Sequence, residues 1–281
     1  MSKKLILIDG HSILNRAFYG VPDLTNSEGI HTNAMYGFLN IMFKFIDEEK
    51  PDYITVAFDV HAPTFRHKRF ADYKGTRKPM LPELKQQVPL IKEILKAMNI
   101  KVVEKEGFEA DDLLGTIAKK CAGQGIDVSV ISGDRDLLQL ADNNIKIRIP
   151  KTKKGVTEVE DYLPSDVNDL YGVTPIEFID VKALMGDTSD NIPGAPGVGP
   201  KTASSLIMQY HSIENVFEHL EELKPPKAKK SISENVEQIK LSKFLATIDI
   251  NVPIDYDIEE AQVGGFFNPN SFELFKRYNF K

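Results

Sequence analysis

Leu5-Ile6-Leu7-Ile8-Asp9 opens the chain with a run of apolar residues that ends in an aspartate. The same arrangement recurs at Ile54-Thr55-Val56-Ala57-Phe58-Asp59 and at Val128-Ser129-Val130-Ile131-Ser132-Gly133-Asp134. Such runs are typical of strands that are buried on both faces of a parallel sheet. Ligands of open α/β sheets bind outside the carboxyl ends of the strands, so the three aspartates are expected in one crevice.

Segments with helical periodicity alternate with these runs. Apolar residues spaced three and four apart predict helices over residues 33–49, 82–98 and 111–122, and Pro89 is expected to break or kink the second. A short strand is expected at Val102-Val103, and an edge pair around 145–149 and 156–159. Strands alternating with helices predict an α/β fold with a mainly parallel sheet flanked by helices.

Beyond about residue 162 the strand signal fades, and a helical second part is expected. Its predicted helices cover residues 165–171, 175–185, 200–210, 212–221 and 231–247. The basic, proline-containing stretch Lys224–Lys230 is interpreted as a solvated loop. The sequence therefore predicts an α/β part followed by a helical part.

The composition is that of an ordinary soluble globular protein. Of the 281 residues, 42% are hydrophobic and 27% are charged, with no apolar run of membrane-spanning length and no signal peptide. A single cysteine, Cys121, excludes a disulfide framework, which fits a reducing cytoplasm. The net charge of −6 does not exclude a nucleic-acid partner, because acids gathered in one crevice would leave the remaining surface basic.

Six further acids are expected to join the three strand-end aspartates, and they come from three short motifs. These are Glu109-Ala110-Asp111-Asp112, Asp134-Arg135-Asp136 and Asp187-Thr188-Ser189-Asp190. Carboxylates crowded in a water-poor cleft must take up protons or bind cations. Because every donor is an oxygen, the expected cations are two or more Mg²⁺ ions, with Mn²⁺ as a substitute.

The alternative for any single acid is a local structural role. An aspartate at a strand end is often a turn former or a helix cap. Asp111 and Asp112 could both serve the first turn of a helix, an alternative that weighs more for Asp112. Number and placement favour the metal site. The six histidines lack metal-binding spacing and the His11-Ser12 pair lacks a nucleophile motif, which argues against zinc and serine hydrolases.

A basic segment follows the second strand-end aspartate, Asp59. It carries six cations, Arg66, Lys68, Arg69, Lys74, Arg77 and Lys78, and the interleaved rings of Phe65, Phe70 and Tyr73. Charge interleaved with rings suits the backbone and bases of single-stranded nucleic acid, and the alternative is an ordinary solvated helix face. The position directly after Asp59 places the segment over the expected metal site, which favours the functional interpretation.

A glycine-rich stretch separates two predicted helices of the second part. It reads Gly194-Ala195-Pro196-Gly197-Val198-Gly199-Pro200-Lys201-Thr202-Ala203. Its glycines permit a tight hairpin, and Pro200 suits the first turn of the helix that follows. Backbone N–H groups at such a turn can hold a phosphate, and Lys201 would add charge. The stretch is interpreted as a helix-hairpin-helix that grips the backbone of a duplex without reading its bases.

With these motifs together, the chain resembles the 5′-nuclease (flap endonuclease) family, most closely the 5′→3′ exonuclease domain at the N-terminus of bacterial DNA polymerase I. The resemblance covers essentially the whole chain. Beyond the acidic motifs and the hairpin, it rests on Ile8-Asp9-Gly10 with Arg16-Ala17-Phe18, on Phe58-Asp59, on Tyr73-Lys74-Gly75-Thr76-Arg77-Lys78 and on Gly186–Gly194.

This resemblance implies a PIN-like α/β core over residues 1–162 with a helical arch at about 61–88. Residues 163–281 would form a helical DNA-binding region, with a helix-hairpin-helix (helix-three-turn-helix) at about 183–210.

The resemblance also assigns roles to single residues. One metal cluster would comprise Asp9, Asp59, Glu109 and Asp111, and the other Asp134, Asp136, Asp187 and Asp190, with Asp112 in an outer position. Lys74 and Arg77 would be the catalytic cations at the scissile phosphate. The remaining DNA contacts would come from Arg16, Arg69, Tyr73 as a stacking ring, Lys78, Gly197, Gly199, Lys201 and Thr202, and the hairpin would also hold K⁺.

The activity implied is two-metal hydrolysis of branched or nicked DNA with a free 5′ end, including an RNA primer paired to DNA, in primer removal and repair. The implied setting is the bacterial cytoplasm at the nucleoid, with the chain as a monomer beside a fused or separate DNA polymerase. Two alternatives stay open: an inactive DNA-binding relative, and an RNA-processing nuclease on the same core that would lack the hairpin and arch.

Overall fold

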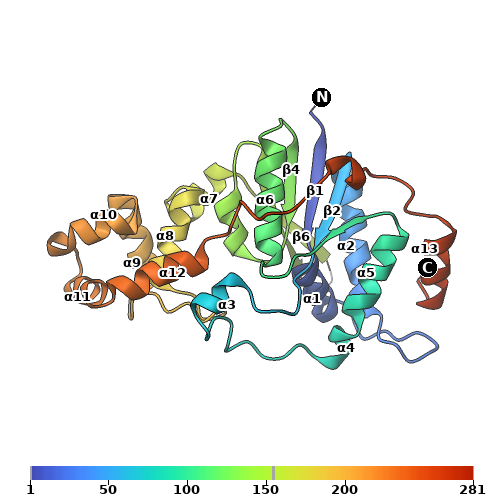
Figure 1. The fold of residues 1–281 in the computed structure, drawn as a ribbon, viewed down its shortest axis with the longest axis horizontal. Coiled ribbons are helices and arrows are strands. Elements are labelled where there is room, and N and C mark those ends of the chain that lie inside the picture. Colours follow the sequence, from blue (N-terminus) through green and yellow to red (C-terminus); the bar gives the residue numbers. More distant parts are fainter. Residues whose placement is uncertain (1, 154–155, 281) are drawn as a thin grey trace.

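A six-stranded sheet forms the centre of the molecule. The computed structural model describes residues 2–153 and 156–280 (Figure 1). The strand order is β3-β2-β1-β4-β5-β6. The strands are β1 (Lys4–Asp9), β2 (Tyr53–Ala57), β3 (Lys101–Val103), β4 (Asp127–Ile131), β5 (Ile145–Lys153) and β6 (Val156–Tyr162). Neighbours from β3 to β5 are parallel and β6 is antiparallel to β5, which confirms the mainly parallel sheet and its edge pair.

Helices cover both faces of this sheet. On β1, Leu5 and Leu7 face one hydrophobic core while Ile6 and Ile8 face the other, as the alternation of a strand requires. One core contains residues of α1 (Gly10–Gly20), α2 (Asn33–Glu49), α5 (Gln87–Ala97) and α13 (Pro269–Arg277). The other contains α6 (Ala110–Ala122) and much of the helical second part. The chain leaves β1 first toward β2 and later returns beside it as β4, so a topological switch point lies at the carboxyl end of β1.

The second part extends to one side of the sheet and is helical (Figure 1). Its helices are α7 (Pro164–Tyr171), α8 (Pro175–Met185), α9 (Pro200–Tyr210), α10 (Ile213–Glu218), α11 (Pro226–Glu234) and α12 (Val236–Ala246). The mostly buried α8 packs against α9, α12 and the 3₁₀ turn η1 (Arg135–Leu140) that follows β4. Within the described ranges, none of the helices combines the length and apolar character needed to cross a bilayer.

Several element boundaries differ from the prediction. The predicted helix over 82–98 is divided at Gln86 into α4 (Pro82–Lys85) and α5, and Pro89 lies in the first turn of α5, where its missing N–H costs nothing. The prediction of a loop over Lys224–Lys230 is wrong from Pro226 onward, because α11 begins there. Ala228 and Ile232 of α11 lie four residues apart and are both buried, so this basic stretch has an apolar face.

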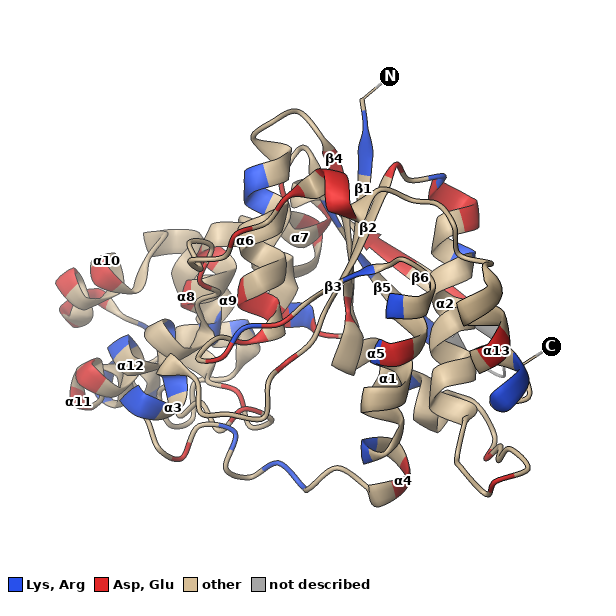
Figure 2. Ribbon diagram, turned by 45° about the vertical axis from the view of Figure 1, so that its right-hand side comes forward, with Lys and Arg blue, Asp and Glu red and all other residues tan. Residues whose placement is uncertain are grey.

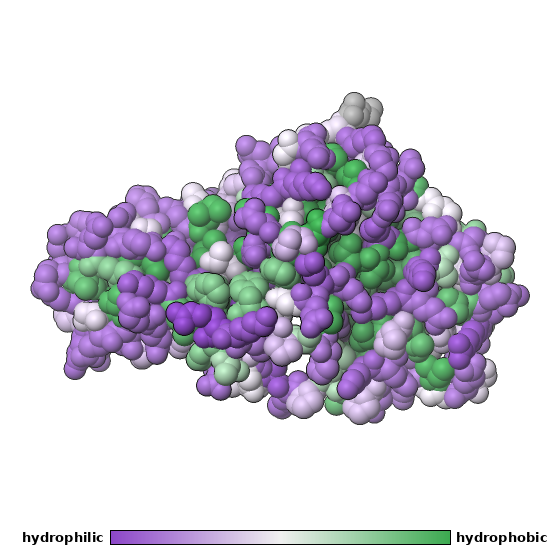
Figure 3. Space-filling view, viewed as in Figure 1, coloured by the Kyte–Doolittle hydropathy of each residue, from purple (hydrophilic) through white to green (hydrophobic). Residues whose placement is uncertain are grey.

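The expected helical arch over 61–88 is mostly irregular. Its helical residues are those of α3 (Phe65–Arg69), of α4 and of the first two positions of α5, and turns and extended backbone make up the rest. Gly75, Pro79 and Pro82 oppose a continuous helix, and Lys74 lies in the left-handed region with φ 56°. Figure 2 shows Lys and Arg residues along the segment that joins α3 to α4. Figure 3, in the same view as Figure 1, shows small openings near the lower edge of the molecule, above this segment.

Candidate active site

The end of β1 holds Asp9 in a fixed position. Its side chain caps α1 by accepting from the backbone N–H of Ser12 at 3.0 Å, and Ser132 after β4 donates its hydroxyl to the other carboxylate oxygen at 2.7 Å. Only 6% of Asp9 is exposed. Burial, together with the nearby charge of Asp59, raises the pKa of Asp9 to about 7. The strand end therefore presents an oriented carboxylate that is costly to ionise without a cation.

Asp59 and Asp111 lie next to Asp9. Asp59 follows β2 and accepts from the backbone N–H of Ala110 at 2.8 Å, which links the strand end to the start of α6. Asp111 stands in the first turn of α6. Burial raises the pKa of Asp111 well above its usual range, and the charges of Asp9 and Asp134 raise it further. These residues form the crowded acidic crevice that the sequence predicts.

Asp134 lies between this group and the acids of the second part. It caps η1 by accepting from the backbone N–H of Asp136 at 2.9 Å, and its charge contributes to the raised pKa values of Asp111 and Asp136. We call Asp9, Asp59, Asp111 and Asp134 the sheet-side acids. Among the described residues, none of these four forms an ion pair with a lysine or arginine.

The remaining acids are paired with cations, and we call Asp136, Asp187 and Asp190 the helix-side acids. The ammonium of Lys182 contacts both Asp136, at 2.7 Å, and Asp187. Burial and Asp134 nevertheless raise the pKa of Asp136 to about 7. Burial would also raise the pKa of Asp187, but hydrogen bonds from Lys182 and Ser189 outweigh it and lower the pKa to about 2.

Lys182 is a site residue that the sequence prediction missed. It lies on α8 and is 6% exposed, yet it lines the cleft. The sequence does contain an indication of its role. Lys182 interrupts the apolar run Val181-Lys182-Ala183-Leu184, and a lysine buried in such a run needs an acidic partner. Asp187, five residues later, could have indicated where that partner lies.

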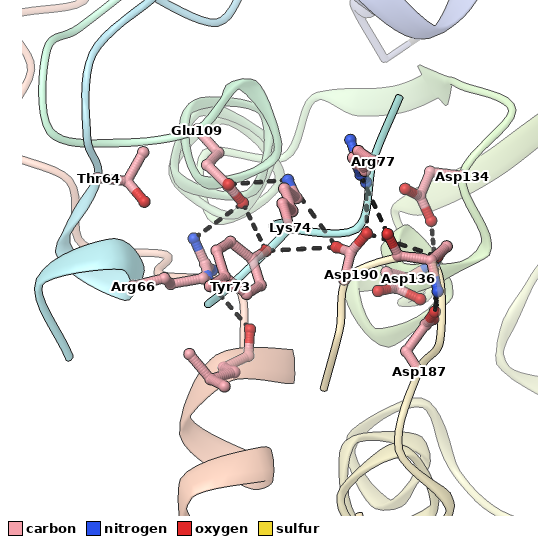
Figure 4. A network of polar contacts seen from close by, with 12 residues as sticks. Thr64, Arg66, Tyr73, Lys74, Arg77, Glu109, Asp134, Asp136, Asp187 and Asp190 are labelled. Atoms are coloured by element: carbon pink, nitrogen blue, oxygen red, sulfur yellow. Dashed lines mark hydrogen bonds and ion pairs between the residues drawn. The ribbon is translucent and has the colours of Figure 1, made fainter. Parts of the chain in front are cut away.

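Figure 4 shows the network around Glu109 and Asp190, which joins the basic segment to both. Lys74 donates to Glu109 at 2.8 Å and lies 3.9 Å from Asp190, while Arg77 pairs with Asp190. The backbone N–H of Lys74 also donates to the carbonyl of Asp190 at 2.8 Å. The predicted catalytic cations therefore reach the cleft, but in this structure they neutralise Glu109 and Asp190, two predicted metal ligands that are not among the residues lining the cleft.

The prediction of Tyr73 as a stacking ring is not supported by its position. Only 4% of Tyr73 is exposed, and its hydroxyl donates to Glu109 at 3.1 Å and to Asp190 at 3.3 Å (Figure 4). A ring enclosed in this way cannot stack on a base. The sequence misled because an aromatic residue among cations suggests exposure, whereas the 72–77 turn folds onto the loop that carries Asp190.

Asp112 is also displaced from its expected role. It is fully buried, and Arg66 donates to its two oxygens at 2.8 and 2.7 Å. The same oxygens accept backbone N–H groups of Glu109 and Asp249. Arg66 is 2% exposed and also donates to the carbonyls of Leu245 and Thr247. Asp112 therefore anchors α3 and the chain after α12 to α6, and we leave it out of the ligand set.

The acids and cations line one cleft of about 1590 Å³. Asp9, Asp59, Asp111, Asp134, Asp136 and Asp187 line it together with Lys74, Arg77, Lys78 and Lys182. In the described part of the chain no three acids or histidines converge into a ready metal-binding group. The donor chemistry still fits a hard divalent cation, because Asp9 and Asp111, whose pKa values are raised, form no ion pair with a lysine or arginine among the described residues.

The remaining DNA-binding candidates are distributed around this cleft. Arg16 on α1 lines it, and its buried Nε has no hydrogen-bond partner among the described residues. Arg69 and Lys78 are exposed on the basic segment, but only Lys78 lines the cleft.

The hairpin lies between α8 and α9. Gly197, Gly199 and Lys201 are exposed, Thr202 is half-buried, and no side chain caps α9. Gly197 has φ 78°, and the space beside it and Gly199 is open, so the backbone is accessible to a ligand. Gly194 approaches Gly186 so closely that an added Cβ would lie 2.3 Å from the Gly186 nitrogen. This crossing connects the loop of the helix-side acids directly to the hairpin.

Comparison with protein families identifies both parts of the chain. Residues 4–172 match the model described as the N-terminal resolvase-like domain of 5′-3′ exonuclease, and residues 173–268 match its C-terminal SAM fold. The chain is 45% identical to DNA polymerase I of Bacillus caldotenax over 281 residues, covering 100% of the chain and 32% of that relative. It is 46% identical to DNA polymerase I of Bacillus subtilis over 278 residues, covering 99% of the chain and 31% of that relative.

Solved structures share the fold. The T5 D15 protein crystallised with metal ions has a TM-score of 0.72 and 21% identity, covering 88% of this chain and 90% of that chain. The catalytic core of Rad2 in complex with DNA substrate has a TM-score of 0.63 and 15% identity, and the match covers 100% of this chain and 88% of that chain. The chain spans about a third of the length of the two polymerase relatives that it matches.

Proposed function

The chain belongs to the 5′-3′ exonuclease family, and on this premise we propose that it is a structure-specific nuclease that hydrolyses phosphodiester bonds near the free 5′ end of branched or nicked DNA. The observation that carries the proposal is the composition of the cleft. Carboxylates with raised pKa values line it from the end of β1, from the first turn of α6 and from the 3₁₀ turn η1 that follows β4. Cations of the basic segment line the same cleft.

Metal ions would be held by the acids of both sides. The sheet-side acids would bind one and the helix-side acids, with Asp134 between them, another; Glu109 would join once Lys74 turns away. The preferred ion is Mg²⁺, with Mn²⁺ as a substitute, because all donors are oxygens. When bound, such ions lower the pKa of a coordinated water and place positive charge beside the reacting oxygens.

The protein's own side chains would orient the metal-binding carboxylates and balance the negative charge of the reacting phosphate. Ser132 and the backbone of Ser12 fix the Asp9 carboxylate, so its direction is set before any ligand arrives. Lys74 and Arg77 are the cations we propose for the scissile phosphate. A phosphate entering the cleft would exchange for Glu109 and Asp190 as their partner, and charge that develops on it would be stabilised by the two cations.

DNA would be held at two further places. Arg16 lies within the cleft, while Arg69 and Lys78 would contact single-stranded DNA along the exposed face of the basic segment. At the hairpin, the backbone at Gly197 and Gly199 with Lys201 and Thr202 would hold a phosphate of the duplex, and we propose that K⁺ also binds there.

We further propose the biological setting. Because the curated relatives are DNA polymerases of about three times this length, the chain would act as a monomer beside polymerase activity, fused or separate, at the nucleoid in the cytoplasm. Its substrates would be the flaps and RNA primers that strand synthesis displaces.

The test uses a duplex with a 5′ flap, labelled at the 5′ end and, separately, within the duplex. Cleavage in Mg²⁺ or Mn²⁺, none in EDTA, and binding without cleavage in Ca²⁺ are expected, because Ca²⁺ aligns its ligands loosely. Asp47→Asn, which alters an exposed acid of α2, serves as the matched control and should cleave normally. Robust cleavage in EDTA, or binding with no cleavage in any metal, would overturn the proposal.

A further inference from the structure

Lys182 is the most deeply buried cation in contact with the helix-side acids. It is 6% exposed and lies between Asp136 and Asp187, with its ammonium 2.7 Å from Asp136 Oδ1 and in contact with Asp187 Oδ2. Its neighbours Val181 and Ala183 on α8 are also buried. A lysine in this environment keeps its charge only because two carboxylates share it.

The two sides of the cleft differ in this respect. The sheet-side acids form no ion pair with a lysine or arginine in the described part of the chain, whereas Asp136 and Asp187 share one ammonium. The oxygens that face Lys182 belong to residues that the proposed function assigns to a metal. A divalent ion cannot use those oxygens while the ammonium occupies the space between them, because the two cations would repel each other at contact distance.

We propose that Lys182 is an internal counter-ion that a metal at the helix-side acids must displace, so that the metal ions bind in order, sheet side first and helix side second. This inference rests on the proposed metal-dependent function. Lys182 lines the cleft, and its flexible stem lets the ammonium move toward the open space. DNA phosphates in the cleft would then pair with the displaced ammonium of Lys182. Binding of the second metal ion would therefore be favoured by the presence of substrate.

The test compares Lys182→Met with Lys182→Arg in DNA-free protein. Mn²⁺ binding is followed by electron paramagnetic resonance of the free ion and by calorimetry. Wild type should bind one Mn²⁺ and a second about tenfold more weakly or worse. Lys182→Met should strengthen the second site by about tenfold and leave the first within about twofold, because one repelling charge is lost. Lys182→Arg, which keeps the charge, should bind the second ion no more tightly than wild type.

An unchanged or weaker second site in Lys182→Met would overturn the inference while leaving the proposed function intact. Absence of any Mn²⁺ binding by the wild type would instead remove the proposed function on which the inference rests.

A second measurement does not depend on whether the Lys182→Met variant folds. In wild type with ¹⁵N-labelled lysine, the Lys182 ammonium signal, assigned by its loss in Lys182→Arg, should move during the second phase of a Mg²⁺ titration and not during the first. A signal that stays constant throughout would show that Lys182 is never displaced, and movement in the first phase would contradict the order.

Discussion

The two sides of the cleft neutralise their negative charge by different means. On the sheet side, the buried Asp9 and the half-buried Asp111 lie among other acids, and their pKa values are raised. On the helix side, Lys182 pairs with Asp136 and Asp187, and Arg77 with Asp190. This difference indicates that the sheet-side acids need a cation from solution to balance their charge. The helix-side acids are already balanced by lysine and arginine, which a metal ion must displace.

The largest expected effect comes from the acid between the two sides. Asp134→Asn should lower the single-turnover rate of flap cleavage by about 10³-fold or more, because both groups of ligands lose a shared carboxylate. Flap binding in Ca²⁺ should stay equal or become tighter, because one charge that repels DNA phosphates is lost. Near-normal turnover, measured beside Asp47→Asn, would remove Asp134 from the metal site.

The next largest effect separates Asp112 from the ligands. Asp112→Asn should destabilise folding by about 3–5 kcal/mol, because it removes the carboxylate that accepts two hydrogen bonds from the buried Arg66 and leaves Arg66 only one carboxylate partner, Glu109 at 3.2 Å. The Mn²⁺ affinity of the folded fraction should stay within about twofold of the wild-type value, since Asp112 is fully buried and its carboxylate is bound to Arg66. Urea unfolding and Mn²⁺ binding at low temperature measure the two quantities. Loss of metal affinity with little loss of stability would return Asp112 to the ligand set.

Two lysines test which element holds the reacting phosphate. Lys74→Ala should lower the single-turnover rate by about 10²-fold and affinity far less, because its cation acts where charge develops. Lys201→Ala should weaken binding and reduce the salt slope by about one unit with a nearly normal rate at saturation. Binding in Ca²⁺ over a salt series, with rates in Mg²⁺, separates these effects. If both variants lose only affinity, the basic segment is merely a binding surface.

The smallest effect concerns the metal-free protein. Asp111→Asn should stabilise it by about 1 kcal/mol near pH 8, because it removes a carboxyl that is costly to ionise in the folded protein. The raised pKa of Asp111 means that the folded carboxyl holds a proton that the unfolded chain releases at lower pH. Wild-type stability in EDTA should therefore fall relative to the variant as pH rises above about 4 toward that raised pKa. Thermal unfolding at several pH values checks the widening difference, and a constant difference would contradict the account.

Local patterns were enough to predict the sheet and the acids at its edge. The apolar runs ending in Asp9, Asp59 and Asp134 correspond to β1, β2 and β4, and the family match confirms the family that the motifs resembled. Helix α1 was missed because Asp9 ends a strand and caps a helix at once, which leaves no loop to mark the boundary.

The pairings within the cleft could not be predicted. Asp112 pairs with Arg66 and Asp190 pairs with Arg77, and the partners are more than forty residues apart in sequence in each case. Which carboxylates stay unpaired therefore depends on the fold and not on local sequence. The burial of Tyr73 likewise depends on the loop that carries Asp190. Sequence spacing identified the right residue types, whereas the structure separates those that hold the protein together from those left facing the cleft.

The most direct test is the anomalous scattering of Mn²⁺ in crystals of the DNA-free protein grown with increasing amounts of the ion. At about one equivalent, the account predicts a single peak among Asp9, Asp111 and Asp134, with Lys182 still between Asp136 and Asp187. At higher concentration a second peak should replace the Lys182 ammonium. A first peak at Asp136 and Asp187, or no peak among the sheet-side acids at any concentration, would contradict it.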